Sequence, residues 1–342
     1  MDTFLDGFLP KAISATIVLV ALTAVAATPD SDMKKVLDNL QSRNGKPIET
    51  LTAVEARQQP SPADAVKDIL SKDKKAKEPK LAEVREIQVA GAAGMIPARV
   101  YVPEGKGPFP VVVYYHGGGF VIATNDTYDA TPRSLAEQTK AIFVSVEYRK
   151  APEAKFPAAH DDAFAAYKWV LENAKTFNGD PKFVAVAGES AGGNLALNVA
   201  IKARDTGVKI PVHELLVYPI AGSDMNTESY NEHASAKPLS KPMMSWFIKQ
   251  YTSKPEEAND TRLNLVAASL KGLSPATVIT ADIDPLKTDG KNLADKLKDA
   301  GVKVEYKNYK GVTHEFFGMA AVVGEAKDAQ RFAAKELKKY LK

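Results

Sequence analysis

Short runs of valine, isoleucine and phenylalanine, separated by helical patterns, constrain the fold of this chain more than any other feature. Such runs suit strands covered by helices on both faces, because an uninterrupted apolar run leaves no polar face for solvent. The sequence predicts eight strands, at about 84–90, 96–102, 111–115, 142–147, 183–187, 214–218, 276–280 and 302–309. Helical patterns separate the later ones, at 158–174, 191–203, 286–300 and 325–341. This alternation predicts an α/β fold with a mostly parallel, doubly wound sheet.

The first 27 residues differ from the rest of the chain. An apolar run follows Lys11 and ends in small residues at the spacing that a signal peptidase reads, although Asp2 and Asp6 stand where positive charge is usual. We expect an export signal at 1–27, and therefore a periplasmic or secreted protein with no stable membrane span once it is processed. The alternative is a cytoplasmic protein that retains this segment as an N-terminal helix.

Two further segments are extra to the α/β alternation. Residues 28–80 predict two short helices and a lysine-rich linker. Residues 81–342 predict the main domain, which an insertion without strand signals interrupts at about 222–266. Because both segments lie outside the alternation, together they can form a helical cap over the domain.

The insertion contains a methionine and aromatic stripe. Pro242 opens a predicted helix on which Met243, Trp246 and Phe247 crowd together. A stripe of this kind is more often core than ligand pocket. Its place in a cap nevertheless makes these three side chains the candidates for substrate contact.

Charge and cysteine content exclude several classes of function. The 45 basic and 42 acidic residues leave a formal charge of only +3, and no basic stripe is interleaved with aromatic residues, so we expect no nucleic-acid partner. The chain has no cysteine, which excludes disulfides, thiolate catalysis and zinc sites built on sulfur. Any nucleophile must therefore be another residue type.

The pentapeptide Gly-Glu-Ser-Ala-Gly at 188–192 supplies a candidate nucleophile, Ser190. It fits the Gly-x-Ser-x-Gly pattern, and it lies where an apolar strand pattern ends and a helical pattern begins. A turn this tight needs glycine beside the serine, and it exposes the serine hydroxyl at a helix N-terminus. The pentapeptide alone is a modest signal, but the strand and helix around it favour a nucleophile over an ordinary turn.

A serine hydroxyl needs a base, which in this strand–turn–helix arrangement follows the serine in the chain. Only His213, His233 and His314 lie downstream. His213 is at the start of a predicted strand, and His233 is in the polar insertion, where surface histidines are expected. His314 lies in a loop just past the last predicted strand, so the carboxyl edge of the sheet would present it beside the serine.

Two aspartates at the end of the preceding strand are candidates for the acid that orients the base. Asp282 and Asp284 both lie there, and from their positions alone either could orient an imidazole. The other would then be a helix N-cap or a solvated neighbour.

Three consecutive glycines follow the predicted strand at 111–115, in the segment His-Gly-Gly-Gly-Phe at 116–120. When a serine attacks an ester carbonyl, the carbonyl oxygen becomes an anion that backbone N–H groups must reach. A glycine loop permits this approach, and the Ala191 amide at the helix start is a further donor. Read alone, the segment would also fit a flexible turn or a phosphate cradle, but the serine downstream favours an oxyanion site.

These motifs, taken in order, resemble those of the bacterial hormone-sensitive-lipase-like (family IV) esterases of the α/β-hydrolase fold. The similarity also includes Asp-Pro-Leu at 284–286, His-Glu-Phe at 314–316 and the stretch at 146–159. It extends from about residue 81 to the C-terminus, and the two extra segments fit the family's cap.

The resemblance implies a carboxylesterase that acts on short- to medium-chain acyl esters without a metal or organic cofactor. By position it makes Ser190 the nucleophile, His314 the base and Asp284 the orienting acid. It also implies structural and oxyanion roles as follows: His116 anchors the glycine loop, and Gly118, Gly119 and Ala191 donate to the oxyanion.

The chain departs from the family pattern at two positions. Glu189 stands where aspartate is usual, which can alter the hydrogen bonds of the elbow, and Lys150 replaces leucine, which we interpret as a surface change. We expect acyl transfer in two halves through an acyl-enzyme on Ser190. The alternatives are an amidase or peptidase with the same triad, and a non-catalytic small-molecule receptor, since the family resembles the plant gibberellin receptors.

Overall fold

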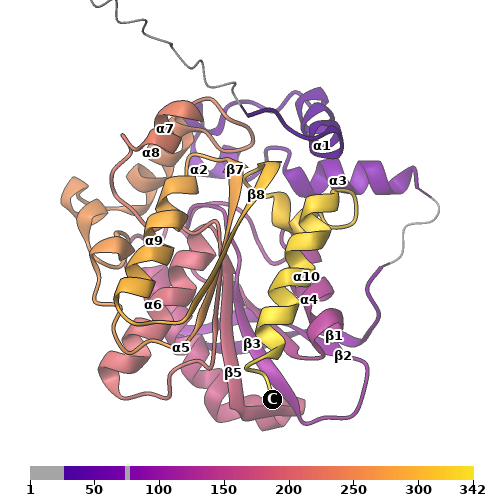
Figure 1. Ribbon diagram of the computed structural model, residues 1–342, viewed down its shortest axis with the longest axis vertical. Coiled ribbons are helices and arrows are strands. Elements are labelled where there is room, and N and C mark those ends of the chain that lie inside the picture. The colour runs from indigo at the N-terminus through magenta and orange to yellow at the C-terminus, as the bar shows by residue number, and fades with distance from the viewer. Residues whose placement is uncertain (1–26, 74–77) are drawn as a thin grey trace, which may run out of the picture.

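The computed structural model describes residues 27–73 and 78–342 (Figure 1). The expected export signal lies outside this range, apart from its last residue. Within the described residues, no helix is both long and apolar enough to cross a membrane.

One sheet organises the structure, and it contains all eight predicted strands. Their order across the sheet is β1-β2-β4-β3-β5-β6-β7-β8. β1 and β2 pair antiparallel, as do β2 and β4, whereas the pairs from β4 through β8 are parallel. The strands are β1 (Leu81–Gly91), β2 (Gly94–Pro103), β3 (Phe109–Tyr115), β4 (Ile142–Val146), β5 (Gly179–Glu189), β6 (Glu214–Val217), β7 (Ala276–Ile283) and β8 (Val304–Thr313). The predicted mostly parallel α/β sheet is thereby confirmed.

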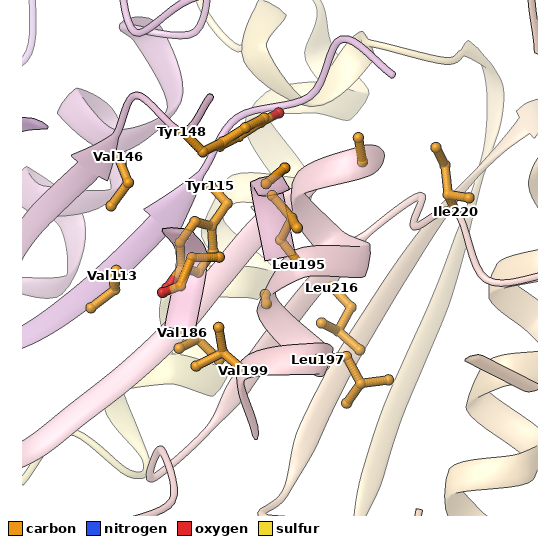
Figure 2. Packing of buried hydrophobic residues seen from close by; sticks show 14 of the residues in the cluster. Val113, Tyr115, Val146, Tyr148, Val186, Leu195, Leu197, Val199, Leu216 and Ile220 are labelled. Carbon is orange, nitrogen blue, oxygen red and sulfur yellow. The ribbon is translucent and has the colours of Figure 1, made fainter. Parts of the chain in front are cut away.

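Helices cover both faces of the sheet, which is why its central strands read as continuous apolar runs. One hydrophobic core lies under α5 (Ala158–Asn173), α6 (Ala191–Thr206) and α9 (Lys287–Asp299). In Figure 2, Val186 of the sheet lies close to Val199 of α6. A second core lies under α4 (Ala130–Thr139) and α10 (Gly324–Lys338) on the opposite face. Helical patterns in the sequence predicted α5, α6, α9 and α10, but not α4.

The two extra segments lie together at one end of the sheet (Figure 1). The N-terminal segment contributes α1 (Ser31–Ser42), α2 (Ala53–Ala56) and α3 (Pro62–Ser71), and the insertion contributes α7 (Glu228–Glu232) and α8 (Lys241–Tyr251). Ser61 caps α3 by accepting a hydrogen bond from the backbone N–H of Asp64. The indole Nε1 of Trp246 donates to the carbonyl oxygen of Leu51 at 3.1 Å, which joins the two segments.

A buried carboxyl group at the start of β6 costs the fold stability at neutral pH. Glu214 is fully buried on the sheet. Burial raises its pKa well above the ordinary value, and the backbone N–H of Ser274 opposes this only in part. In the unfolded chain the same carboxyl group has a pKa of about 4.3. Between these two pKa values the unfolded state releases its proton while the folded state keeps it, so stability falls as pH rises.

We therefore expect Glu214→Gln to stabilise the protein, with a gain that grows with pH. The melting temperature should rise by about 2 °C or more at pH 8 and clearly less at pH 4.5, because close to its unfolded-state pKa the group still holds its proton in a large fraction of the unfolded chains. The same substitution at the exposed Glu172 of α5 is the control and should show no such trend. An equal gain at both pH values would contradict the assignment.

Candidate active site

A strained turn between β5 and α6 presents Ser190. The serine has φ 56° and ψ −116°, an unfavourable backbone conformation for a residue with a side chain. A Cβ atom at Gly188 would lie 2.1 Å from the carbonyl oxygen of Gly192, and one at Gly192 would lie 1.9 Å from that of Tyr115. The flanking glycines are thus required by direct backbone contact, as the strand–turn–helix pattern predicts.

The structure brings Ser190, His314 and Asp284 together from three separate loops. The hydroxyl of Ser190 lies 3.0 Å from Nε2 of His314, and Nδ1 of His314 lies 2.7 Å from Oδ2 of Asp284. The other oxygen, Oδ1, accepts the backbone N–H of Leu286 at 2.9 Å, which orients the carboxylate. All three polar side chains are buried.

The charge around His314 favours its protonated form. Burial opposes that form, but the adjacent carboxylate of Asp284, helped by the nearby Glu315 and Glu189, outweighs burial and raises the pKa of His314 above its ordinary value. This arrangement leaves Nε2 able to accept the serine proton and to hold it as an imidazolium.

Asp282, the other candidate acid, points to different partners. Its Oδ1 accepts from Nζ of Lys287 at 2.7 Å and from Nδ2 of Asn308 at 3.3 Å. The structure therefore distinguishes the two aspartates that the residue pattern alone left equivalent.

Neither of the other downstream histidines reaches the serine, and neither lies on the surface. His213 is buried, with its ring stacked on Tyr340 at 4.7 Å and Nε2 at 3.0 Å from Oγ1 of Thr277. His233 is also buried, so the expected surface position in the insertion is wrong. The short helix α7 folds back onto α9 and carries this histidine inward.

The glycine loop follows β3 and runs past the serine. Gly118 has φ 96° and Gly119 has φ 59°, values that residues with side chains rarely adopt. Both glycines line the same cavity as Ser190, while Ala191 begins α6 directly after the serine.

The absence of side chains at the glycines also allows aromatic side chains of the protein to approach the loop, a role that the sequence pattern does not predict. A Cβ atom at Gly117 would lie 2.2 Å from the hydroxyl of Tyr128, and one at Gly119 would lie 2.3 Å from the ring of Phe247. The loop is therefore packed against two aromatic side chains that only glycine allows so close.

His116 anchors this loop from inside the protein. Its ring stacks on that of Tyr148 at 4.4 Å, and Nδ1 lies 2.8 Å from the carbonyl oxygen of Gly117. Burial lowers the pKa of His116 to about 4, so the ring is neutral at physiological pH. These contacts agree with the structural position expected for this histidine.

A cavity of about 910 Å³ opens above the serine, between the cap and the sheet. Ser190 and His314 line its floor, and Met243 and Phe247 of α8 line it from the cap. Trp246 does not line the cavity. Its indole is buried between the insertion and the N-terminal segment, so it belongs to the interior of the cap.

Two glutamates, the buried Glu189 and the partly exposed Glu315, flank the serine and the histidine. Glu189 accepts hydrogen bonds from the hydroxyls of Tyr114, at 2.5 Å, and Tyr218. Burial raises the pKa of Glu189 to about 7, although both hydrogen bonds lower it. Glu315 accepts from the hydroxyl of Tyr128, and burial raises its pKa as well. The departure from aspartate distinguished Glu189 in the sequence, whereas Glu315 entered only as the middle residue of the His-Glu-Phe motif, with no role assigned to it.

Charged side chains hold the segment that follows the glycine loop. Lys150 is not a surface change, because its side chain is largely buried, lines the cavity and donates to the carbonyl oxygen of Ala123 at 2.8 Å. Glu147, its ionic partner, accepts the backbone N–H of Asn125 at 2.7 Å. Glu147 lies only three residues before Lys150, but the carbonyl group of Ala123 lies 27 residues before it, and no local pattern in the sequence indicates this second contact.

Arg57 connects the cap to this same segment. Its Nε donates to the carbonyl oxygen of Val121 at 2.9 Å, and Nη2 donates to that of Ala151 at 2.7 Å. The guanidinium also forms a two-point ion pair with Glu153. Val121 lies two residues after Gly119, so the N-terminal segment contacts the chain immediately after the glycine loop.

In residues 27–73 and 78–342, no group of three or more histidine, aspartate or glutamate side chains could hold a metal ion.

Comparisons with known proteins agree with this geometry. Residues 112–318 match the family model for the α/β-hydrolase fold. The chain is 41% identical to Carboxylesterase NlhH of Mycobacterium tuberculosis over 76% of its length and 84% of that protein. It is 32% identical to the ethyl acetate hydrolase of Pseudomonas putida, over 72% of this chain and 79% of the other. The solved structure of a hyperthermophilic esterase from the archaeon Pyrobaculum calidifontis superposes with a TM-score of 0.84 at 37% identity, over 91% of this chain and 98% of that one.

We expect Arg57→Gln to slow the reaction of Ser190 with a serine-directed phosphonate by about tenfold. Loss of the bond to Val121 lets the glycine loop move, and small displacements of charge-stabilising donors are costly. The rate of covalent labelling, followed by mass spectrometry, measures this effect.

Glu153→Gln is the matched control, because it weakens the ion pair of Arg57 but leaves both carbonyl bonds in place. Its labelling rate should stay within about twofold of the wild type, since exposed ion pairs contribute little. Equal slowing of the labelling reaction in both variants would contradict this prediction, because it would assign the effect to the ion pair with Glu153 and not to the bond with Val121.

Proposed function

The chain belongs to the hormone-sensitive-lipase-like carboxylesterases of the α/β-hydrolase fold, and we propose that it cleaves acyl esters through a covalent intermediate on Ser190. The observation that carries this proposal is the continuous chain of hydrogen-bond distances from Ser190 through His314 to Asp284. A base at 3.0 Å from the hydroxyl supports an enzyme rather than a non-catalytic receptor on the same scaffold.

In the first half of the reaction, Nε2 of His314 removes the serine proton as Oγ attacks the ester carbonyl carbon. The imidazolium that forms is stabilised by Asp284, which also fixes the tautomer by accepting from Nδ1. The imidazolium then gives its proton to the ester oxygen, the carbon–oxygen bond breaks, and the alcohol leaves.

In the second half, a water molecule takes the place of the alcohol. His314 removes a proton from this water, the water oxygen attacks the acyl carbon, and the bond to Oγ of Ser190 breaks as the serine recovers its proton. The products are the carboxylic acid and the free enzyme.

The backbone amides of Gly118, Gly119 and Ala191 are our proposed donors to the oxyanion that forms in each half. Support comes from the position of both glycines on the cavity wall beside Ser190, and of Ala191 at the N-terminus of α6. The positive φ values of the two glycines set the direction of the loop's peptide groups.

We propose that short- to medium-chain acyl groups bind against α8. Met243 and Phe247 line the cavity there and offer apolar contact. The cap, built from the N-terminal segment and the insertion, would shield this part of the cavity from water. Trp246, a sequence-based candidate for substrate contact, is assigned to the interior of the cap instead.

Substitution of the two aspartates tests the proposed triad. The protein should hydrolyse p-nitrophenyl butanoate without added metal, and Ser190→Ala should abolish this. We expect Asp284→Asn to lower kcat by about 10²–10⁴-fold with little change in KM, because the amide leaves the histidine in the wrong tautomer.

Asp282→Asn is the matched control, since it changes a carboxylate two residues away that binds Lys287 and Asn308. Its kcat should remain within a few fold of the wild type. Circular dichroism of both variants establishes that they are folded. Inactivity of Asp282→Asn alone would overturn the assignment of the acid.

We also propose that residues 1–27 direct export and are removed. The support is the apolar run that ends in small residues. Expression of the full sequence in a Gram-negative host should then give a periplasmic protein that begins near Thr28, as measured by mass spectrometry of the intact chain. Recovery of the Met1–Lys11 peptide from the purified protein would count against export.

A further inference from the structure

The proposed hydrolysis determines on which side of the cavity the alcohol leaves. His314 must return a proton to the ester oxygen as the carbon–oxygen bond breaks, so that oxygen lies within hydrogen-bond reach of Nε2. The rest of the alcohol therefore extends along the wall next to His314. Glu315 follows His314 directly, and its side chain lines the cavity.

This wall is polar, in contrast to the wall made by α8. Besides Glu315, it includes Tyr128, whose hydroxyl contacts Glu315, and three further residues of the same neighbourhood. We call these five residues the leaving-group wall: Thr124, Thr127, Tyr128, Lys150 and Glu315.

The polar wall and the apolar wall meet the glycine loop at different residues. The Tyr128 hydroxyl lies against Gly117, whereas the Phe247 ring lies against Gly119. An ester whose carbonyl oxygen points to this loop would thus have distinct surroundings for its two ends. The apolar wall suits the acyl chain, and the polar wall is left for the alcohol.

The leaving-group wall retains unused hydrogen-bonding capacity. Oε1 of Glu315 accepts from Tyr128, but Oε2 accepts no hydrogen bond from the described residues. The ammonium of Lys150 uses two of its three donors, on Ala123 and Glu147. The hydroxyls of Thr124 and Thr127 lie 3.3 Å apart, a weak contact that a ligand could replace.

We propose that this wall binds an alcohol that carries hydroxyl groups in addition to the esterified one, as glycerol and sugars do. The inference rests on the proposed ester hydrolysis at Ser190, and it adds the class of alcohol. A plain alkyl alcohol would displace water from Glu315 and Lys150 without replacing the hydrogen bonds that the water makes. A site that binds hydroxyl groups therefore discriminates against alcohols that lack these groups.

Two esters with the same acyl group provide the test. Propyl butanoate and glyceryl monobutanoate share the acyl chain and a three-carbon alcohol, and they differ only by two hydroxyl groups. We expect kcat/KM of the wild type to be about tenfold higher for the glyceryl ester, which corresponds to one or two hydrogen bonds.

Two substitutions in the wall should reduce this ratio. Glu315→Met, which keeps an unbranched side chain of similar length, should bring the ratio close to one. Thr127→Val, which exchanges a hydroxyl for a methyl group, should lower it by about two- to fivefold. Met243→Leu on the apolar wall is the control, and it should leave the ratio between the two esters as in the wild type.

p-Nitrophenyl butanoate separates the possible failures, because its leaving group needs no hydroxyl contacts. If the protein hydrolyses none of the three esters, the proposed esterase function itself is overturned. Hydrolysis of p-nitrophenyl butanoate with a wild-type ratio of one or less would overturn only the polyol inference, as would a ratio unchanged by both wall substitutions. Thr127→Val keeps the test decisive if Glu315→Met does not fold.

Discussion

The strained backbone of Ser190 is the constraint on which the rest of the site depends. A φ of 56° with ψ −116° costs on the order of 1–3 kcal/mol, so the surrounding structure must hold it. This conformation is maintained because the backbones of Gly188 and Gly192 pack closely against each other, and that of Gly192 packs against β3. Because β3 also leads into the glycine loop, the same packing fixes the distance between the nucleophile and the loop that faces it.

Beneath this turn, the chain buries the carboxyl group of Glu189. The extra methylene of Glu189, relative to aspartate, lets its carboxyl group reach the hydroxyls of both Tyr114 and Tyr218. The ring of Tyr218 lies 4.4 Å from that of His314, so this network supports the base as well as the turn. The two tyrosines come from the ends of β3 and β6, and they connect the elbow to its neighbouring strands.

The sequence predicted those features that arise from local patterns. Apolar runs gave all eight strands, and motif order selected Ser190, His314 and, through the family resemblance, Asp284. What it missed depends on contacts between distant segments. Arg57 lies 64 residues before Val121, whose carbonyl oxygen it binds. Trp246 and Phe247 are neighbours on one helix, yet only their different directions around the helix axis place one in the cap interior and the other over Gly119.

The glycine loop shows how cap and catalytic domain are joined mechanically. Its successive residues contact the insertion through Gly119 and Phe247, and again through Phe120, whose ring stacks on that of Tyr251 at 4.2 Å. The next residue, Val121, is bound by Arg57 of the N-terminal segment. Phe120 itself has φ 64°, a strained value that these flanking contacts must stabilise. Both parts of the cap therefore act on the loop that carries the proposed oxyanion donors, so any movement that opens the cap must also release the restraints on that loop.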